Sequence, residues 1–340
     1  SRGYDTPEAA RAFLRADLPL PDPFLLRDMD KVVERVRRAL ERRERIVVFG
    51  DYDVDGITAT TLLTDYLRSR GGDCIPYIPS RLEEGYGLNE PAIRALREKG
   101  AALILTVDCG ITALEEARLC RSLGIDLCIT DHHECKESLP DCIAVVDAHR
   151  RDHTYPHQDL SGVGVAFKLA AALEGDQAAM LRRYCDLLCL GTVADVMPLL
   201  GENRVFVTRG LAALQAPVRP GLRALMEECG CLGQAVTAGT VGYTLAPRIN
   251  AAGRMGQVGL ALDLFLTEDP ARAASLAQQL CQLNRRRQAV ETAIYQSAVA
   301  KLPPREKPAA IVLSDPAWHQ GVVGIVASRL AEEYRCPTFL

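Results

Sequence analysis

Short apolar runs and helical repeats alternate along the first 150 residues of the chain. Continuous apolar runs bounded by turn or acidic residues predict buried β-strands, and they occupy residues 46–49, 74–79, 102–107, 125–130 and 143–147. Apolar residues recur at helical spacing between these runs, at 28–43, 57–72, 91–100 and 111–124. Strands that alternate with helices of this length predict an α/β fold, in which a parallel sheet carries helices on both faces.

The pattern becomes mostly helical after the last of these strands. Residues 161–200 and 204–302 repeat with helical spacing, and 271–302 is predicted as one long helix that bridges two domains. A fresh strand at 309–314 precedes a glycine turn and a helix. We therefore expect three parts: a domain with the sheet at 1–203, a helical connecting region at 204–302, and the beginning of a second, smaller α/β domain at 303–340. The missing initial Met and an end inside an apparent strand lead us to expect a trimmed sequence.

Polar residues follow three of the predicted strands directly. Asp51, Asp53 and Asp55 come after the first strand, Asp108 follows 102–107, and the triplet Asp131, His132 and His133 follows 125–130. The carboxyl ends of parallel strands meet at one edge of a sheet, where α/β proteins bind their ligands. We expect these three groups to converge there.

So many carboxylates at one place repel each other unless a cation binds between them. Oxygen ligands with one or two imidazoles suit Mn²⁺ or Mg²⁺ better than zinc. Two divalent cations about 3.5–4 Å apart would balance this charge and suit phosphoester hydrolysis. Asp195, a lone carboxylate in the apolar segment GTVADVMPL, is the best further ligand, although it also fits a helix cap.

Two other interpretations of the acidic loop are weaker. The pattern D-x-D-x-D-G begins a calcium EF-hand loop, but the twelfth position, which needs a bidentate Glu, is Leu62. Asp and Gly are also ordinary residues of a solvated turn. A dinucleotide-binding domain is disfavoured because no G-x-G-x-x-G follows the first strand.

Composition indicates an ordinary globular protein. Apolar residues make up 48% and charged residues 25% of the 340 residues, and no apolar run reaches the length of a membrane span. The start of the chain has no signal-peptide layout. Twelve scattered cysteines without a C-x-x-C pair indicate reduced thiols of a cytoplasmic protein rather than a zinc site. The net charge of −4 argues mildly against nucleic-acid binding, but bound cations would restore positive charge locally.

Four segments, GDYDVDG, TVDCG, TDHHE and GTVADVMPL, resemble the ordered motifs of the DHH phosphoesterase superfamily. Four more, RGYDTPEAARAFL, SGVGVAFKLAAAL, APRINAAGRMG and WHQGVVGIVASRL, are similar to the bacterial RecJ family of single-strand-specific 5′→3′ DNA exonucleases. The similarity runs in order over essentially all of the chain.

The resemblance implies roles for the residues at the sheet edge. It makes Asp53, Asp55, Asp108, His132 and Asp195 metal ligands, with Asp51 as a further ligand or a supporting acid. Asp131 would orient a histidine by hydrogen bonding, and His133 would bind a metal or the scissile phosphate. Many relatives have a His where this chain has Phe49, which leaves open whether Asp51 replaces that ligand.

Phosphate-binding residues are expected outside the metal site. Arg forks match phosphate oxygens, and backbone N–H groups at a helix start bind anions. The candidates are Arg81 for a terminal 5′-phosphate, Arg248, Asn250 and Arg254 in a loop punctuated by Pro and Gly, and His319 and Gly321 at a helix start. A solvated surface charge is the alternative for each Arg, and it is the better explanation of the run 285–287.

The resemblance implies metal-dependent hydrolysis of single-stranded DNA from its 5′ end to 5′-mononucleotides, in DNA repair and recombination. A helicase and a single-strand-binding protein are candidate partners, and no membrane is expected. A DHH hydrolase acting on short oligonucleotides, cyclic dinucleotides or pyrophosphate is the alternative. A non-catalytic replication scaffold is disfavoured by the intact acid set. Longer relatives carry a complete second α/β domain and an OB-fold that grips single strands; this sequence has only the start of the first.

Overall fold

The computed structural model describes residues 5–16, 18–80, 84–302 and 308–340. Its main sheet is parallel throughout and has the strand order β2-β1-β3-β4-β5. The strands are β1 (Arg45–Phe49), β2 (Cys74–Tyr77), β3 (Ala101–Val107), β4 (Asp126–Thr130) and β5 (Ala144–Val146). The predicted parallel α/β sheet is confirmed. Because β2 and β3 lie on opposite sides of β1, the strand order reverses there, and a crevice is expected at the carboxyl ends of β1 and β3.

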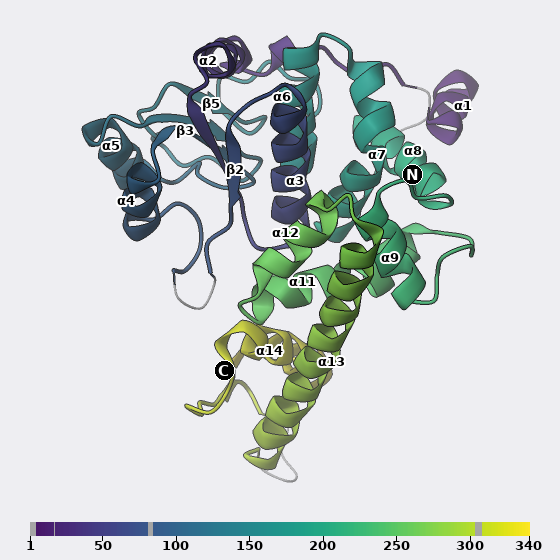
Figure 1. Ribbon diagram of the computed structural model, residues 1–340. Helices are drawn as coiled ribbons and strands as arrows, with labels where there is room; N and C mark the ends of the chain where they lie inside the picture. The colour runs from purple at the N-terminus through teal and green to yellow at the C-terminus, as the bar shows by residue number, and fades with distance from the viewer. Residues whose placement is uncertain (1–4, 17, 81–83, 303–307) are drawn as a thin grey trace.

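Helices cover both faces of this sheet (Figure 1). One face carries α2 (Met29–Arg42), α3 (Val54–Ser69) and α6 (Gly162–Glu174), and α7 (Gln177–Ala194) packs against α3 and α6. The other face carries α4 (Glu90–Glu98) and α5 (Leu114–Ser122). Alternate residues of β1 join the two apolar cores: Ile46 and Val48 pack on the first face, and Val47 and Phe49 on the second. This two-residue period is what a strand buried on both faces produces.

The segments that precede and follow this sheet are helical. Before it come α1 (Pro7–Arg15) and a short 3₁₀ helix (Pro23–Leu25). After α7 come α8 (Gly201–Leu214), α9 (Pro220–Glu228), α10 (Ala238–Thr240), a π-helix (Val241–Leu245), α11 (Ala246–Arg254), α12 (Val258–Leu266) and α13 (Pro270–Ala300). The apolar core of α3, α6 and α7 continues into these helices.

Two predictions about this region have clear outcomes. The single long helix predicted for 271–302 is present as α13. The loop predicted around Arg248 and Arg254 is wrong, because these residues lie in α11. Pro247 stands in the first turn of that helix, directly after the π-helix, so it lies where one helix form changes to the other and does not end the helical segment.

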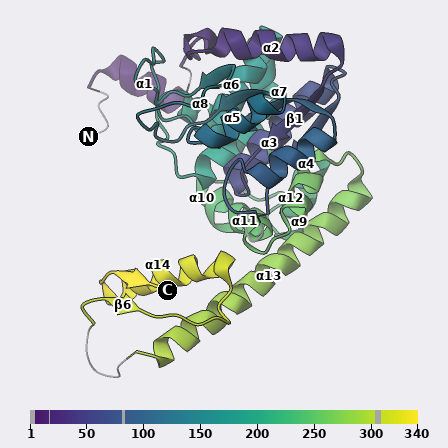
Figure 2. The same ribbon diagram turned by 90° about the vertical axis from the view of Figure 1, so that its left-hand side faces the viewer.

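The far end of α13 leads to the last elements of the chain. There, α14 (Gln320–Tyr334) packs against α13 beside a small parallel sheet of β6 (Ile311–Val312) and β7 (Thr338–Phe339). Figure 2 shows α13 running from beneath the main sheet to this small unit. No helix in the described part of the chain is both long and apolar enough to cross a membrane. All twelve cysteines are free thiols.

Candidate metal centre

The acidic loop after β1 leads into α3 and supplies the cap of that helix. Asp53 is the N-cap of α3, and its side chain accepts a hydrogen bond from the N–H of Gly56 at 3.0 Å. Asp55 stands in the first helical turn, where a negative charge is favourable. The alternation of aspartates therefore turns one carboxylate onto the helix end and another, only 1% exposed, into the interior.

Asp55 is held by a second helix start. Its carboxylate accepts hydrogen bonds from the N–H groups of Gly162 and Val163, at 2.6 and 2.9 Å, where α6 begins. A Cβ atom at Gly191 of α7 would lie 2.5 Å from Oδ1 of Asp55, so this close packing requires glycine there. Three helices, α3, α6 and α7, thus fix one carboxylate.

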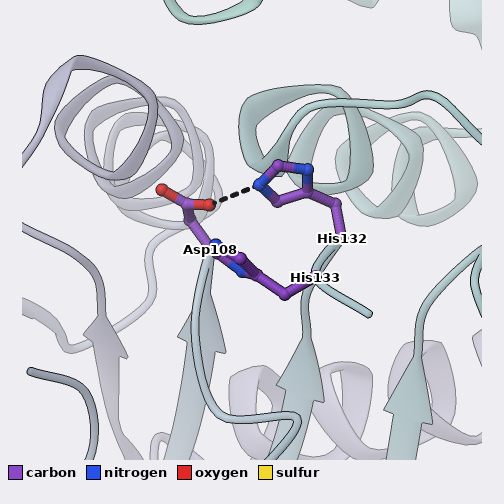
Figure 3. A group of neighbouring side chains, drawn as sticks. All are labelled: Asp108, His132 and His133. Carbon is purple, nitrogen blue, oxygen red and sulfur yellow. Dashed lines mark ion pairs between the residues drawn. The ribbon is translucent and has the colours of Figure 1, made fainter. Parts of the chain in front are cut away.

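Asp108 follows β3 in a left-handed backbone conformation, with φ of 60°. Asp is one of the few side chains that tolerate this region. A Cβ atom at Gly162 would lie 2.5 Å from Cβ of Asp108, so the start of α6 approaches it as closely as glycine allows. The conformation directs the carboxylate toward His132, with Oδ1 of Asp108 at 3.0 Å from Nε2 of His132 (Figure 3).

Three carboxylates surround that imidazole nitrogen. Besides Asp108, Oδ2 of Asp195 lies 3.7 Å and Oδ2 of Asp55 lies 3.8 Å from Nε2 of His132. Asp195 is the residue at the C-terminal end of α7, and this position at a helix end is compatible with a role as a metal ligand. Strand ends β3 and β4 and helices α3 and α7 each contribute one of these side chains.

Potential ligand atoms form three overlapping groups, each within 4.8 Å. The groups are Asp51 with Asp53 and Asp108, Asp55 with His132 and Asp195, and Asp108 with His132 and His133. Because Asp108 and His132 are each shared by two groups, the three join into one centre. The structure therefore brings together all the acids and histidines that the sequence placed at this edge, apart from Asp131, which supports His133 from behind.

Burial and like charge act on these acids in the same direction. Burial, followed by the charges of Asp195 and Asp53, raises the pKa of Asp55 well above its ordinary value. Burial, followed by the charges of Asp55 and Asp53, does the same to the pKa of Asp108. The pKa of Asp195 rises to about 6, chiefly through burial. Each carboxylate is therefore destabilised as an anion unless a positive charge stands between them.

His132 is kept neutral in this setting. Burial, and then the neighbouring His133, lower the pKa of His132 to about 4, and the ring also hydrogen-bonds the backbone of Leu160. A neutral imidazole is the form that binds metals, and an anchored ring presents its other nitrogen in one direction. Buried carboxylates with one neutral imidazole make a donor set that fits a hard divalent cation such as Mn²⁺ or Mg²⁺.

Asp131 acts on the second histidine of the triplet. It is buried and accepts hydrogen bonds from the N–H groups of Ile111 at 2.9 Å and His132 at 2.8 Å, and its Oδ1 lies 2.7 Å from Nδ1 of His133. Burial alone would raise the pKa of Asp131, but the bond with His133 holds it below its ordinary value. The same bond raises the pKa of His133 to about 9, so His133 is a cation at neutral pH.

Comparison with known proteins agrees with this geometry. The model of the "DHH family, N-terminal domain" matches residues 45–192. A solved structure described as "exonuclease RecJ bound to manganese" superposes with a TM-score of 0.85 at 40% identity, covering 95% of this chain and 81% of that one. The chain belongs to the RecJ family of DHH proteins.

Curated RecJ proteins are longer than this chain. The "Single-stranded-DNA-specific exonuclease RecJ" of Bacillus subtilis is 42% identical over 342 residues, which cover 100% of this chain and 43% of that protein. The protein of the same name from Thermus thermophilus is also 42% identical, and the match covers 98% of this chain and 50% of that protein. The chain thus spans about half the length of these relatives.

Phe49, where many RecJ relatives are expected to carry a His, cannot bind a metal here. Its side chain is fully buried on the α4–α5 face and stacks on Tyr77 with ring centres 5.3 Å apart. Asp51 lies in the same group of potential ligands as Asp53 and Asp108.

Two tyrosines border the centre, and sequence reasoning missed both. The ring of Tyr86 stands edge-on to His133 at 6.4 Å and edge-on to Tyr52 at 6.3 Å. The only signal was their position, since Tyr52 lies between two of the loop aspartates and Tyr86 lies in the loop after β2.

Apart from Arg81, the residues expected to bind phosphate lie on α11 or at the start of α14. They already form hydrogen bonds within the protein. The side-chain oxygen of Asn250 accepts a hydrogen bond from the N–H of Val54 at 3.1 Å, which fixes α11 to the start of α3. Arg248 donates to the carbonyl of Thr244, and Arg254 donates to the carbonyl of Gly321. His319 is the N-cap of α14 and accepts from the N–H of Gly321.

Two further predictions concern isolated arginines. Arg81 lies outside the described residues. The run 285–287 is predicted to be a solvated face, which is wrong for Arg287: it is buried, and its guanidinium bonds Asn284 and Glu291 of the same helix. Arg285 and Arg286 are exposed.

Proposed function

We propose that this chain is the catalytic part of a metal-dependent exonuclease that hydrolyses single-stranded DNA from its 5′ end to mononucleotides. The observation that carries the proposal is the convergence of Asp55, Asp108 and Asp195 on Nε2 of His132. The names of the RecJ relatives support the substrate and the reaction. The 5′→3′ direction rests on the family resemblance.

Two divalent cations, Mn²⁺ or Mg²⁺, complete the centre in this proposal. Their ligands would be Asp51, Asp53, Asp55, Asp108, His132 and Asp195. Bound cations of this kind polarise a phosphoryl oxygen and make water a better nucleophile at neutral pH. Solved RecJ structures from Thermus thermophilus are described in complex with Mn²⁺ and with Mg²⁺, which supports either ion.

The two histidines have different roles in this proposal. His132, held neutral by burial, offers Nε2 as a ligand. His133, cationic through its bond with Asp131, can donate a hydrogen bond to an oxygen of the scissile phosphate and offset its charge. Asp131 acts as a positioning residue, because it fixes the backbone of the triplet and the ring of His133 together.

The side of the centre formed by α11 and α14 would hold the DNA backbone. A guanidinium has five donors, so Arg248 and Arg254 can bind phosphate oxygens in addition to their backbone carbonyls. The start of α14 at His319 and Gly321 offers the positive end of the helix dipole to an anion, and the N–H of Gly321 itself donates to Nδ1 of His319. Arg81 is proposed to bind the 5′-phosphate.

The cellular role follows the same resemblance. We place the enzyme in the cytoplasm, in DNA repair and recombination. A helicase that supplies single strands and a single-strand-binding protein that covers them are the expected partners.

A degradation assay tests the activity. Single-stranded DNA labelled at either end is incubated with the purified chain and Mn²⁺, or with EDTA. We expect mononucleotides from the 5′ end in Mn²⁺ only, with no product from Asp108→Ala. Asp141→Asn is the matched control, since Asp141 is an exposed acid paired with Arg121 on the α5 side of the fold. Turnover of dinucleotides or pyrophosphate without degradation of long strands would instead assign the chain to small substrates.

A further inference from the structure

Helix α7 ends at the metal centre in a tight turn. The N–H of Val196 donates to the carbonyl of Val193, and the N–H of Met197 donates to the carbonyl of Thr192, both at 3.2 Å. This pair of bonds defines the Schellman turn, which requires a left-handed residue just after the helix cap. Glycine usually takes that position, but here it is valine, with φ of 58°.

The valine is unfavourable for the fold in two ways. A β-branched side chain at positive φ is strained, because its methyl groups crowd the backbone. Packing does not offset the strain, since Val196 is 85% exposed. Other left-handed C-terminal helix caps of the described chain carry Gly175, Ala16, Arg43 and Arg335, none of which is β-branched. Backbone strain of this kind clusters at active sites and ligand-binding positions.

The position of Val196 ties it to the chemistry. It follows Asp195, whose carboxylate groups with Asp55 and His132. A second exposed apolar side chain lies on the neighbouring element: a Cβ atom at Gly242 would lie 3.9 Å from Val193, and the next residue, Tyr243, is 87% exposed. Tyr243 belongs to a π-helix, a form that often marks functional positions. The chain therefore exposes two apolar side chains, Val196 and Tyr243, on adjoining elements close to Asp195.

We propose that Val196 is a substrate-contact residue that packs against the sugar or base of the nucleotide whose phosphate binds at the metal centre. This inference rests on the function proposed above and deepens it. An apolar methyl pair cannot bind a phosphate, but it fits the faces of deoxyribose and nucleobase and contributes affinity without reading sequence. It would favour nucleotides over pyrophosphate at this centre.

The variant Val196→Gly tests the substrate contact and the backbone strain by two separate measurements. Glycine removes the strain as well as the side chain, so the Tm should rise by about 2–4 °C. The KM for end-labelled single-stranded DNA should rise about tenfold with kcat within about twofold, the pattern of a lost binding contact. Val196→Thr keeps the branched shape and the strain, so its Tm should stay within about 1 °C of the parent and its KM should rise less.

Two control variants test the two effects one at a time: the relief of backbone strain and the loss of an exposed apolar side chain. Arg43→Gly relieves a left-handed residue at the end of α2, by the amino end of β1, where φ is 55°; it should raise the Tm and leave KM unchanged. Val218→Ala removes exposed methyl groups from a residue that is 94% exposed before α9, and should change neither value.

The outcomes separate this inference from the proposed function. If Val196→Gly gains stability but keeps the parent KM, the side chain has no substrate role and the inference is overturned while the nuclease assignment stands. A lower Tm for Val196→Gly would show that the valine stabilises the turn, which also overturns it. A parent chain that neither binds nor degrades single-stranded DNA refutes the proposed function, and the inference is refuted with it.

Discussion

Two buried clusters of charged side chains both involve the helices α6 and α7, and their charges are arranged differently. In one, Lys168 and Glu202 are both at most 1% exposed and pair at 2.5 Å. Tyr155 donates to Glu202, and Lys168 also donates to the carbonyl of Pro21 and the side chain of Gln177. Positive and negative charge balance, so this cluster needs nothing from outside the chain.

The other cluster is the metal centre, and it does not balance. Asp55, Asp108 and Asp195 converge on a neutral His132, and their mutual repulsion adds to burial in raising the pKa of Asp55 and Asp108. A balanced buried pair orders the fold, whereas buried charges of one sign destabilise it and indicate a ligand of opposite charge. Both clusters are buried. They differ in net charge, and the uncompensated negative charge marks the one that is expected to bind a ligand.

The largest expected effect comes from removing one acid of the metal centre. Asp108→Asn keeps the side-chain shape, and Asn tolerates the left-handed backbone. We expect exonuclease activity to fall about 10⁴-fold, equivalent to about 5 kcal/mol of activation free energy. In EDTA the Tm should rise, because one of the mutually repelling acids is gone. A variant with lower activity and also a lower Tm in EDTA would contradict the comparison.

Breaking the balanced cluster should have the opposite signature. Lys168→Met leaves Glu202 buried without its counter-charge, which should lower the free energy of unfolding by about 3–5 kcal/mol. The double variant Lys168→Met with Glu202→Gln should recover most of that loss, because neither charge remains. Urea unfolding of the parent, both single variants and the double variant measures the coupling. Additive losses would show that the two side chains do not act as a pair.

Metal binding should stabilise only the unbalanced cluster. At a Mn²⁺ concentration 100 times its Kd, the parent should gain about 2.7 kcal/mol of apparent stability from one bound ion. Thermal unfolding with and without Mn²⁺ measures this gain. The Lys168→Met and Glu202→Gln double variant should keep it, and Asp108→Asn should lose most of it. An equal gain in Asp108→Asn would place the ion elsewhere.

The two clusters also differ in how far they could be predicted from the sequence. Apart from Asp195, the acids of the metal centre come after strands, and the carboxyl ends of parallel strands share an edge, so periodicity placed Asp55, Asp108 and His132 together. It could not show that Asp53 also caps α3, or that the start of α6, more than 100 residues from Asp55, donates to its carboxylate. Those contacts depend on how α6 packs onto the sheet, which no local pattern records.

The balanced cluster had no sequence signal at all. Lys168 stands in the apolar segment SGVGVAFKLAAAL, and Glu202 lies between the helical segments predicted at 161–200 and 204–302. Their pairing depends on the packing of α6 beside α8. Likewise, Pro247 and Gly253 predicted a loop, but one occupies a helix start and the other allows close contact with Tyr52. Tertiary packing overrode the local preference in each case.

The smallest effect is expected from Asp131, which supports the metal centre through hydrogen bonds but does not belong to the three groups of potential ligands. Asp131→Asn puts an amide N–H₂ among the donors of Ile111, His132 and His133, so one of these hydrogen bonds must be lost. Without the carboxylate, His133 also loses the partner that keeps it cationic. Supporting residues of this kind change activity by about 10–100-fold.

The loss should appear in kcat while KM and the Mn²⁺-induced rise in Tm stay near parent values, because the metal ligands themselves are unchanged. His133→Gln provides the comparison, since it removes the same cation without disturbing the backbone bonds of Asp131. Similar kcat values for the two variants would show that Asp131 acts through His133. A lost response of the Tm to Mn²⁺ in Asp131→Asn alone would show instead that Asp131 holds the ligand geometry of His132 through its backbone.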